Sequence, residues 1–153
     1  MRKKIFNQVE EWNSEHPEMA YPVEPSASEE EIKLLQDVLK EKYAYQLTEE
    51  YLNFLRKCNG FTFNGLTVCG TKQVKDSKGT VVVESLLGIT EYIRKDLGCQ
   101  NLIGLGEGNE SFLVYDIATQ QFQYRDESID TIIGAFNSFG ELINSVSEEE
   151  CIF

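Results

Sequence analysis

The spacing of apolar side chains changes along the chain, from a helical period near the N-terminus to a two-residue period in the middle. Ile5, Val9 and Trp12 recur at helical spacing and predict a short amphipathic helix. We expect this helix to end near His16-Pro17, because proline disfavours a helical residue before it. Residues 19–25 contain two more prolines and predict an extended connector.

Two further helices are predicted from their start signals. Ser28 and Glu31 have the spacing of a capping box, in which each side chain satisfies a free backbone amide of the other. The apolar side of that helix consists of Ile32, Leu35, Val38 and Leu39. A second start signal lies at Thr48 and precedes a wide apolar stripe that ends at Asn59-Gly60. The stripe consists of Tyr51, Leu52, Phe54, Leu55 and Cys58.

From residue 61 the pattern favours strands. Residues 61–63 and 66–68 alternate about Asn64-Gly65, the dipeptide best suited to a two-residue hairpin turn. Another turn is expected at residues 76–79. Three more strands are expected at residues 102–105, 112–116 and 122–125. Ser138 opens a last helix whose buried side consists of Phe139, Leu142, Ile143 and Val146.

Residues 81–97 do not have one clear period. Residues 81–87 are too short and too apolar to assign, whereas Ile89, Ile93 and Leu97 favour a helix over residues 91–97. The whole pattern predicts an α+β fold with N-terminal helices packed against a largely antiparallel sheet, and with a closing C-terminal helix. The length of 153 residues predicts a single domain over residues 1–153.

Net charge adds more to this picture than composition does. The chain carries 14 basic and 26 acidic residues, a net charge of −12. Residues 101–153 hold ten of the carboxylates and one cation, Arg125. Such a field repels phosphate backbones and favours encounter with a basic protein, so we expect no direct nucleic-acid binding. The other interpretation is that the acidic surface only keeps the protein in solution.

Targeting and metal signals are weak. The apolar runs are too short to cross a bilayer, and the basic start at residues 1–4 is not followed by the apolar segment of a signal peptide. We therefore expect a cytoplasmic protein that does not bind membranes. The scattered cysteines and the lone His16 predict neither a metal site nor a cofactor, and Gly104 to Gly108 are interpreted as a tight turn and not as a phosphate loop.

Four segments in a fixed order carry a family resemblance: residues 25–32; residues 47–55 followed by Asn59-Gly60; Ile103-Gly104 followed by residues 112–116; and residues 138–142. They resemble the SUKH superfamily, which includes yeast cell-wall regulators and many bacterial immunity proteins. The resemblance extends over most of the chain. It departs from the family at Thr48, where a proline is usual, although threonine at a cap and proline in a first turn both start helices.

The resemblance implies an immunity-type protein, not an enzyme, that binds and neutralises a basic protein toxin, which in some members is a nuclease. The family supplies no active-site motif, so no catalytic residue is carried over. The acidic and aromatic residues after position 106 are the predicted partner-binding residues: Glu107, Glu110, Tyr115, Asp116, Tyr124, Asp126, Glu127 and Asp130. We expect Phe112 and Phe122 to be buried, and Tyr115 and Tyr124 to be exposed.

Two other functions remain open at the level of sequence. One is an intracellular scaffold or regulatory module with a host partner. The other is a hydrolase that uses two of these carboxylates as acid and base, for which spacing alone is weak support. The oligomeric state is not predicted.

Overall fold

The computed structural model describes residues 5–150. Residues 1–4, which carried the argument about a signal peptide, and residues 151–153, which include Cys151, lie outside the described part. The helices are α1 (Ile5–Glu15), α2 (Glu29–Tyr43), α3 (Glu49–Lys57), α4 (Leu86–Glu91) and α5 (Phe139–Glu150). A short 3-10 turn, η1 (Pro17–Met19), follows α1, and one π-helical turn, η2 (Tyr92–Asp96), extends α4.

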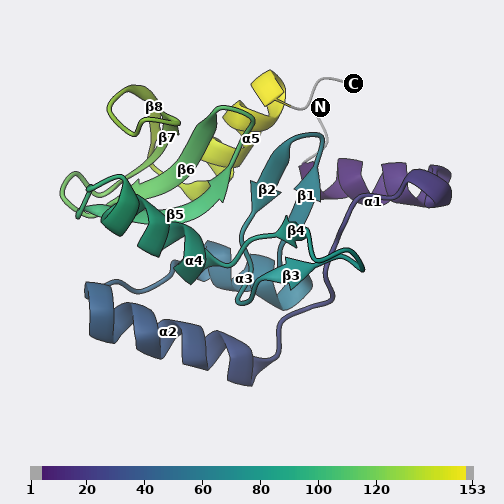
Figure 1. Cartoon of the computed structure of the whole chain (residues 1–153), viewed down its shortest axis with the longest axis horizontal. Coiled ribbons are helices and arrows are strands. Elements are labelled where there is room, and N and C mark those ends of the chain that lie inside the picture. The colour runs from purple at the N-terminus through teal and green to yellow at the C-terminus, as the bar shows by residue number, and fades with distance from the viewer. Residues whose placement is uncertain (1–4, 151–153) are drawn as a thin grey trace.

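Six strands form the main sheet in the order β1-β2-β5-β6-β7-β8, and every neighbouring pair is antiparallel. They are β1 (Phe61–Phe63), β2 (Leu66–Val68), β5 (Leu102–Glu107), β6 (Ser111–Asp116), β7 (Gln121–Asp126) and β8 (Ile132–Phe136). The strands β3 (Val74–Lys75) and β4 (Val81–Val83) form a separate two-stranded ribbon. The predicted α+β class, antiparallel sheet and closing helix are confirmed (Figure 1).

The predicted start signals form as expected. The Ser28 hydroxyl accepts a hydrogen bond from the Glu31 amide at 3.0 Å, and the Glu31 carboxylate accepts one from the Ser28 amide at 3.0 Å. Thr48 caps α3 by accepting a hydrogen bond from the Tyr51 amide at 3.3 Å. Asn64 and Gly65 both have positive φ angles, 52° and 89°, as a two-residue hairpin turn of this kind requires.

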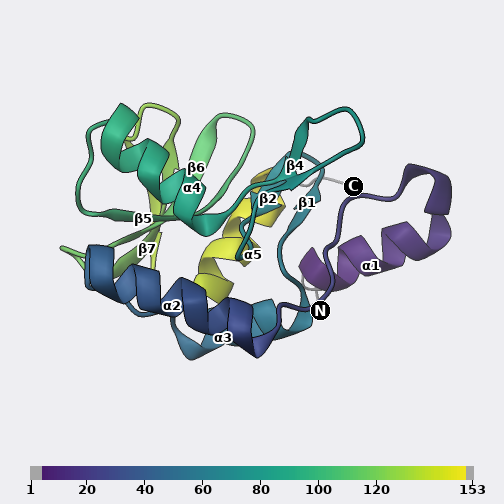
Figure 2. The same ribbon diagram turned by 60° about the horizontal axis from the view of Figure 1, so that its bottom comes forward.

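Helices cover the two faces of the sheet differently. On one face, the Phe122 ring lies 6.3 Å from that of Phe139 on α5, and Tyr51 on α3 donates a 2.6 Å hydrogen bond to the Cys69 carbonyl. On the other face, the Gly104 amide donates a 2.9 Å hydrogen bond to Thr90 on α4. In Figure 2 the helices α2 and α3 lie below the sheet, with α5 between α3 and the strands.

Three local expectations need correction. Gly104 and Gly106 lie within β5 at a bulge and not in a turn, which begins only at Gly108. A Cβ atom at Gly104 would collide with Ile89, and one at Gly106 with the Thr67 carbonyl, so close packing requires both glycines. The strand β8 was not predicted. The helix α3 ends at Lys57. Asn59 lies in the link between α3 and β1, and its side chain forms hydrogen bonds with Thr71, which follows β2.

Candidate protein-binding surface

Three hairpin turns lie at one end of the six-stranded sheet. Because the strands alternate in direction, the turn at Asn64-Gly65, the turn at residues 108–110 and the turn at residues 127–131 all fall on the same side. The first two are in contact, since a Cβ atom on Gly65 would collide with the Asn109 side chain. This end lies along the top of the sheet in Figure 1.

Five of the eight predicted binding residues come together at this end. We call it the acidic end and define it by Glu107, Glu110, Asp126, Glu127 and Asp130. Ser111, next to Glu110, lies directly opposite Asp126 in the β6–β7 register. Since neighbouring strands are about 4.8 Å apart, the two acidic turns are separated by roughly 10 Å, close to the Debye length at physiological salt. Their charges therefore act on an approaching partner as one field.

Little positive charge offsets the acidic end. Glu110, Glu127 and Asp130 are exposed, and Glu107 and Asp126 are half-buried. The β1–β2 hairpin has no charged residue, and Arg125 is the one Lys or Arg after position 100. The guanidinium of Arg125 faces into the protein, where it pairs with Asp116.

Two apolar side chains that were not predicted adjoin the acidic end. Ile132 and Ile133 begin the edge strand β8, directly after the acidic turn, and are 49% and 51% exposed. The β-branched run from Thr131 to Ile133, placed between Asp130 and Gly134, is the sequence signal that could have revealed this strand. Exposed apolar residues next to charge are typical of the centre and rim of a protein interface.

The acidic turn has a fixed conformation. The Asp126 amide donates to the Thr131 carbonyl at 3.1 Å, and the Asp126 carboxylate accepts a 2.8 Å hydrogen bond from the Ser128 hydroxyl. Ile129 is buried with a φ of 73°, a left-handed conformation that is strained for a β-branched residue. The surrounding contacts must hold it there.

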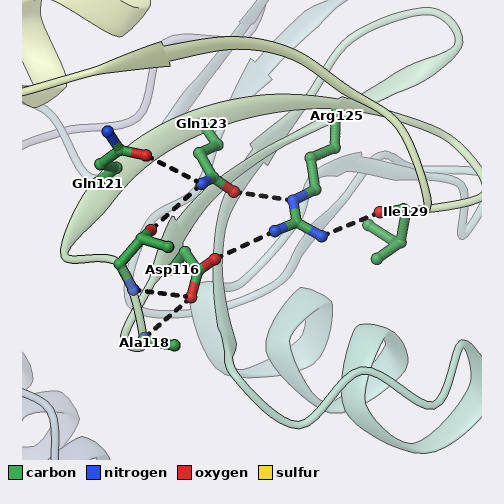
Figure 3. Close-up of polar contacts among 7 residues, drawn as sticks. Asp116, Ala118, Gln121, Gln123, Arg125 and Ile129 are labelled. Atoms are coloured by element: carbon green, nitrogen blue, oxygen red, sulfur yellow. Dashed lines mark hydrogen bonds and ion pairs between the residues drawn. The ribbon is translucent and has the colours of Figure 1, made fainter.

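Arg125 supplies one of those contacts and connects the turn to the sheet (Figure 3). Its guanidinium donates to the Ile129 carbonyl at 3.0 Å, to the Gln123 side chain at 2.8 Å and to the Asp116 carboxylate at 3.2 Å. The arginine and aspartate side chains are only 12% and 8% exposed. A nearly buried ion pair thus fixes the backbone that presents Glu127 and Asp130.

Asp116 is therefore buried and not a surface residue, so it does not belong to the acidic end. Its carboxylate also accepts hydrogen bonds from the Ala118 amide at 2.9 Å and the Thr119 amide at 3.4 Å, which caps the turn between β6 and β7. That turn lies at the opposite end of the sheet from the acidic end. Asp116 stabilises the hairpin.

The two tyrosines differ from the prediction as well. Tyr124 is buried, at 8% exposure, because it shares a sheet face with Leu113, beneath which the helices pack. Tyr115 is half-buried between the rings of Tyr45 and Phe122, each 5.0 Å away. Phe112 and Phe122 are buried as expected. The alternation of side chains along a strand shows which residues share a face of the sheet. It does not show which part of either face the helices leave exposed.

Glu107 differs chemically from the other carboxylates of the acidic end. Burial, and then the negative charge of Glu84, raise the pKa of the Glu107 carboxyl. Its neighbour Cys69 is buried, and burial raises the pKa of that thiol as well. Glu107 therefore forms the inner, less accessible edge of the acidic end.

Residues 5–150 carry neither a metal-binding cluster nor a membrane-spanning helix. No group of three or more His, Cys, Asp or Glu side chains there has the geometry to hold a metal ion. Within the same residues, no helix combines the length and apolar character needed to span a bilayer.

Neither the known protein-family models nor the curated proteins compared with this chain match it. The resemblance to the SUKH superfamily accordingly stays a prediction based on the order of its motifs.

Proposed function

We propose that this chain is a non-enzymatic immunity-type protein that captures a basic protein toxin at its acidic end. The observation that carries the proposal is the grouping of five carboxylates on adjacent turns, with the Arg125 guanidinium turned inward and two exposed isoleucines beside them. The SUKH-like order of motifs supports the same reading.

The two kinds of side chain serve different steps of binding. The acidic field accelerates and orients the encounter with a positively charged surface. Salt screens this attraction, so the acceleration falls as the salt concentration rises. Ile132 and Ile133 then provide apolar area whose burial slows dissociation. If the toxin is a nuclease, the carboxylates occupy the surface that otherwise receives nucleic-acid phosphates, and the encounter takes place in the cytoplasm.

The conformation of the turn strengthens this proposal. A partner gains affinity when the groups it contacts are already ordered, since less conformational entropy is lost on binding. The hydrogen bonds of Asp126 and Arg125 order residues 126–131 before any partner arrives.

Capture and neutralisation together test the proposal. The tagged chain would be expressed in its native cells, bound proteins recovered at low salt and identified by mass spectrometry, and the partner expressed alone. We expect a basic protein that arrests growth by itself and is silenced, at a one-to-one ratio, by the purified chain. A partner that is not toxic would instead support the regulatory-module alternative.

The hydrolase alternative predicts a different result. Turnover of a substrate by the purified chain, abolished by Glu107→Gln or by Asp126→Asn, would contradict the non-enzymatic proposal. Stoichiometric inhibition of the partner without turnover would agree with it.

A further inference from the structure

A cavity of about 390 Å³ lies on the far side of the protein from the acidic end. Its walls come from α3, from the first turns of α5, and from Phe61 and Val68, the residues of the β1–β2 hairpin farthest from its turn. α5 begins just after β8 ends, at the end of the sheet opposite the acidic turns. Its volume is within the range of roughly 300–1,000 Å³ that is typical of small-molecule sites.

Most of the wall is apolar and aromatic. Phe54, Phe61 and Phe139 contribute three phenyl rings, and the Phe54 ring lies 5.9 Å from that of Phe61 and 6.4 Å from that of Phe139. Val68 and Ile143 add aliphatic surface. Phenyl faces attract cations as well as apolar groups, because the face of the ring carries partial negative charge.

Two carboxylates also line the cavity. Glu50 on α3 accepts a 2.9 Å hydrogen bond from the Gly140 amide through one oxygen. Glu141 accepts a 3.2 Å hydrogen bond from the Asn137 amide, also through one oxygen. Within residues 5–150, no donor bonds the second oxygen of either carboxylate, and neither carboxylate forms an ion pair with a Lys or Arg.

The helix terminus offsets only part of this charge. The first turn of α5 contributes about half a positive elementary charge, against two negative carboxylates. The remaining negative charge faces an apolar cavity whose rings also favour a cation. An anionic ligand would be repelled, and a neutral one would gain from the phenyl rings alone.

We propose that this cavity binds a small organic cation, an ammonium or guanidinium compound whose apolar body lies among the three phenylalanine rings while its charge faces Glu50 and Glu141. The volume favours a free small molecule over a single side chain of a partner protein, which would leave much of the cavity empty. This inference does not depend on the proposed function, because it concerns another part of the fold.

Three probes of nearly equal shape test the proposal: 2-phenylethylammonium, 2-phenylethanol and phenylacetate, which are cationic, neutral and anionic. Each would be titrated into the ¹⁵N-labelled protein while amide chemical shifts are followed. We expect the cation to shift the amides of residues 50–54 and 138–144 at the lowest concentration, the alcohol to need roughly ten-fold more, and phenylacetate to have no effect there.

Charge-neutralising variants locate the cation. Glu50→Gln and Glu141→Gln each keep an oxygen that can accept the helix-capping hydrogen bond, so the fold is retained. Each should weaken 2-phenylethylammonium by about two- to five-fold and leave 2-phenylethanol unchanged. The matched control is Glu49→Gln, whose carboxylate instead pairs with Arg56, and it should leave both probes unchanged.

Three outcomes would overturn the proposal. Equal affinity for the cation and the alcohol would make the cavity an apolar site without charge selection. Shifts of the cation spread over all acidic surfaces, and lost equally with Glu49→Gln, would mean nonspecific attraction. The absence of shifts in residues 138–144 at millimolar cation would mean that the cavity is not a binding site. None of these outcomes bears on toxin binding at the acidic end.

Discussion

Arg125→Met tests whether the buried ion pair holds the sheet and its acidic turn together. Methionine replaces the aliphatic part of the arginine side chain and removes the guanidinium. Asp116 keeps its hydrogen bonds from the hairpin amides but loses its countercharge in a site that is only 8% exposed. The Gln123 side chain and the Ile129 carbonyl each lose a donor. Removing one partner of a buried pair costs about 3–5 kcal/mol, and the slight exposure of this pair places the expected loss near 3 kcal/mol.

Asp116→Asn removes the other charge of the pair and, together with Arg125→Met and the double variant, completes a double-mutant cycle. Asparagine still accepts the hydrogen bonds of the Ala118 and Thr119 amides through its one oxygen, but an amide nitrogen takes the place of the oxygen that accepts from Arg125. Both the charge and the hydrogen bond to Arg125 are therefore lost, and we expect about 2 kcal/mol of destabilisation. The double variant buries no unpaired charge. It should be about 1–2 kcal/mol more stable than the sum of the two single losses predicts.

Urea unfolding, followed by far-ultraviolet circular dichroism, measures each free energy of unfolding. With a slope of roughly 2 kcal/mol per molar urea, the Arg125→Met midpoint should fall by about 1.5 M at an unchanged slope. Arg56→Met is the matched control, because its ion pairs with Glu29 and Glu49 are at the surface, and its midpoint should stay nearly unchanged. A loss below about 1 kcal/mol for Arg125→Met, or strictly additive losses, would refute the account of this network.

Three other predictions concern packing, thiol reactivity and pH. Gly104→Ala should lower stability by about 1–3 kcal/mol in thermal unfolding, because the added methyl group collides with Ile89 and separates α4 from β5; an unchanged melting temperature would contradict that packing. In a Cys151→Ser background at pH 8, a disulfide reagent should modify half-buried Cys99 well before Cys58 and Cys69. Burial raises the pKa of the Cys58 thiol to about 12 and that of the Cys69 thiol well above its ordinary value, so little reactive thiolate forms at either. Equal rates of modification for all three thiols would show that the core opens readily. Glu107→Gln should be more stable than the wild type at pH 8, with an advantage that shrinks as the pH falls toward 4.5. The raised pKa of Glu107 means that the folded state retains a proton that the unfolded state releases, so the wild type loses stability as the pH rises above 4.5. A stability difference independent of pH would contradict the burial of this carboxyl.

Local signals predicted most of the elements correctly. The capping box at Ser28, the cap at Thr48 and the turn at Asn64-Gly65 each depend on contacts within a few residues, and all three form. The ambiguous residues 81–97 divide into β4, α4 and η2, so the predicted helix begins earlier, at Leu86.

Errors arose where distant contacts decide the structure. β8 was missed because its burial pattern is mostly exposed, so it has no alternating apolar face. Gly104 was interpreted as part of a turn because its need for a small residue arises from Ile89, fifteen residues away.

The candidate site was predicted in part. Chain order places Glu110 and Asp126 to Asp130 in alternate turns, with the β6–β7 turn between them, and alternate turns of an antiparallel sheet fall at the same end. Asp116 and Tyr124 could not be separated from them by sequence, because their burial depends on Arg125 and on which face the helices cover. The cavity beside α5 joins residues from 50 to 144, and no local pattern predicted it.

The central claim is that the position of the acidic charge, and not its total, captures the partner. The combined variant Glu110→Gln, Asp126→Asn, Glu127→Gln and Asp130→Asn removes four charges from the acidic end. The matched control removes four exposed charges elsewhere, through Glu15→Gln, Glu18→Gln, Glu30→Gln and Glu41→Gln, and leaves the same net charge.

The decisive measurement is the association rate constant of each variant with the captured partner, by stopped-flow fluorescence at low and high salt. We predict that the acidic-end variant associates at least about ten-fold more slowly than the wild type at low salt and loses most of its salt dependence, while the control stays within about two-fold. Equal slowing of both variants, or no slowing of either, would contradict the claim.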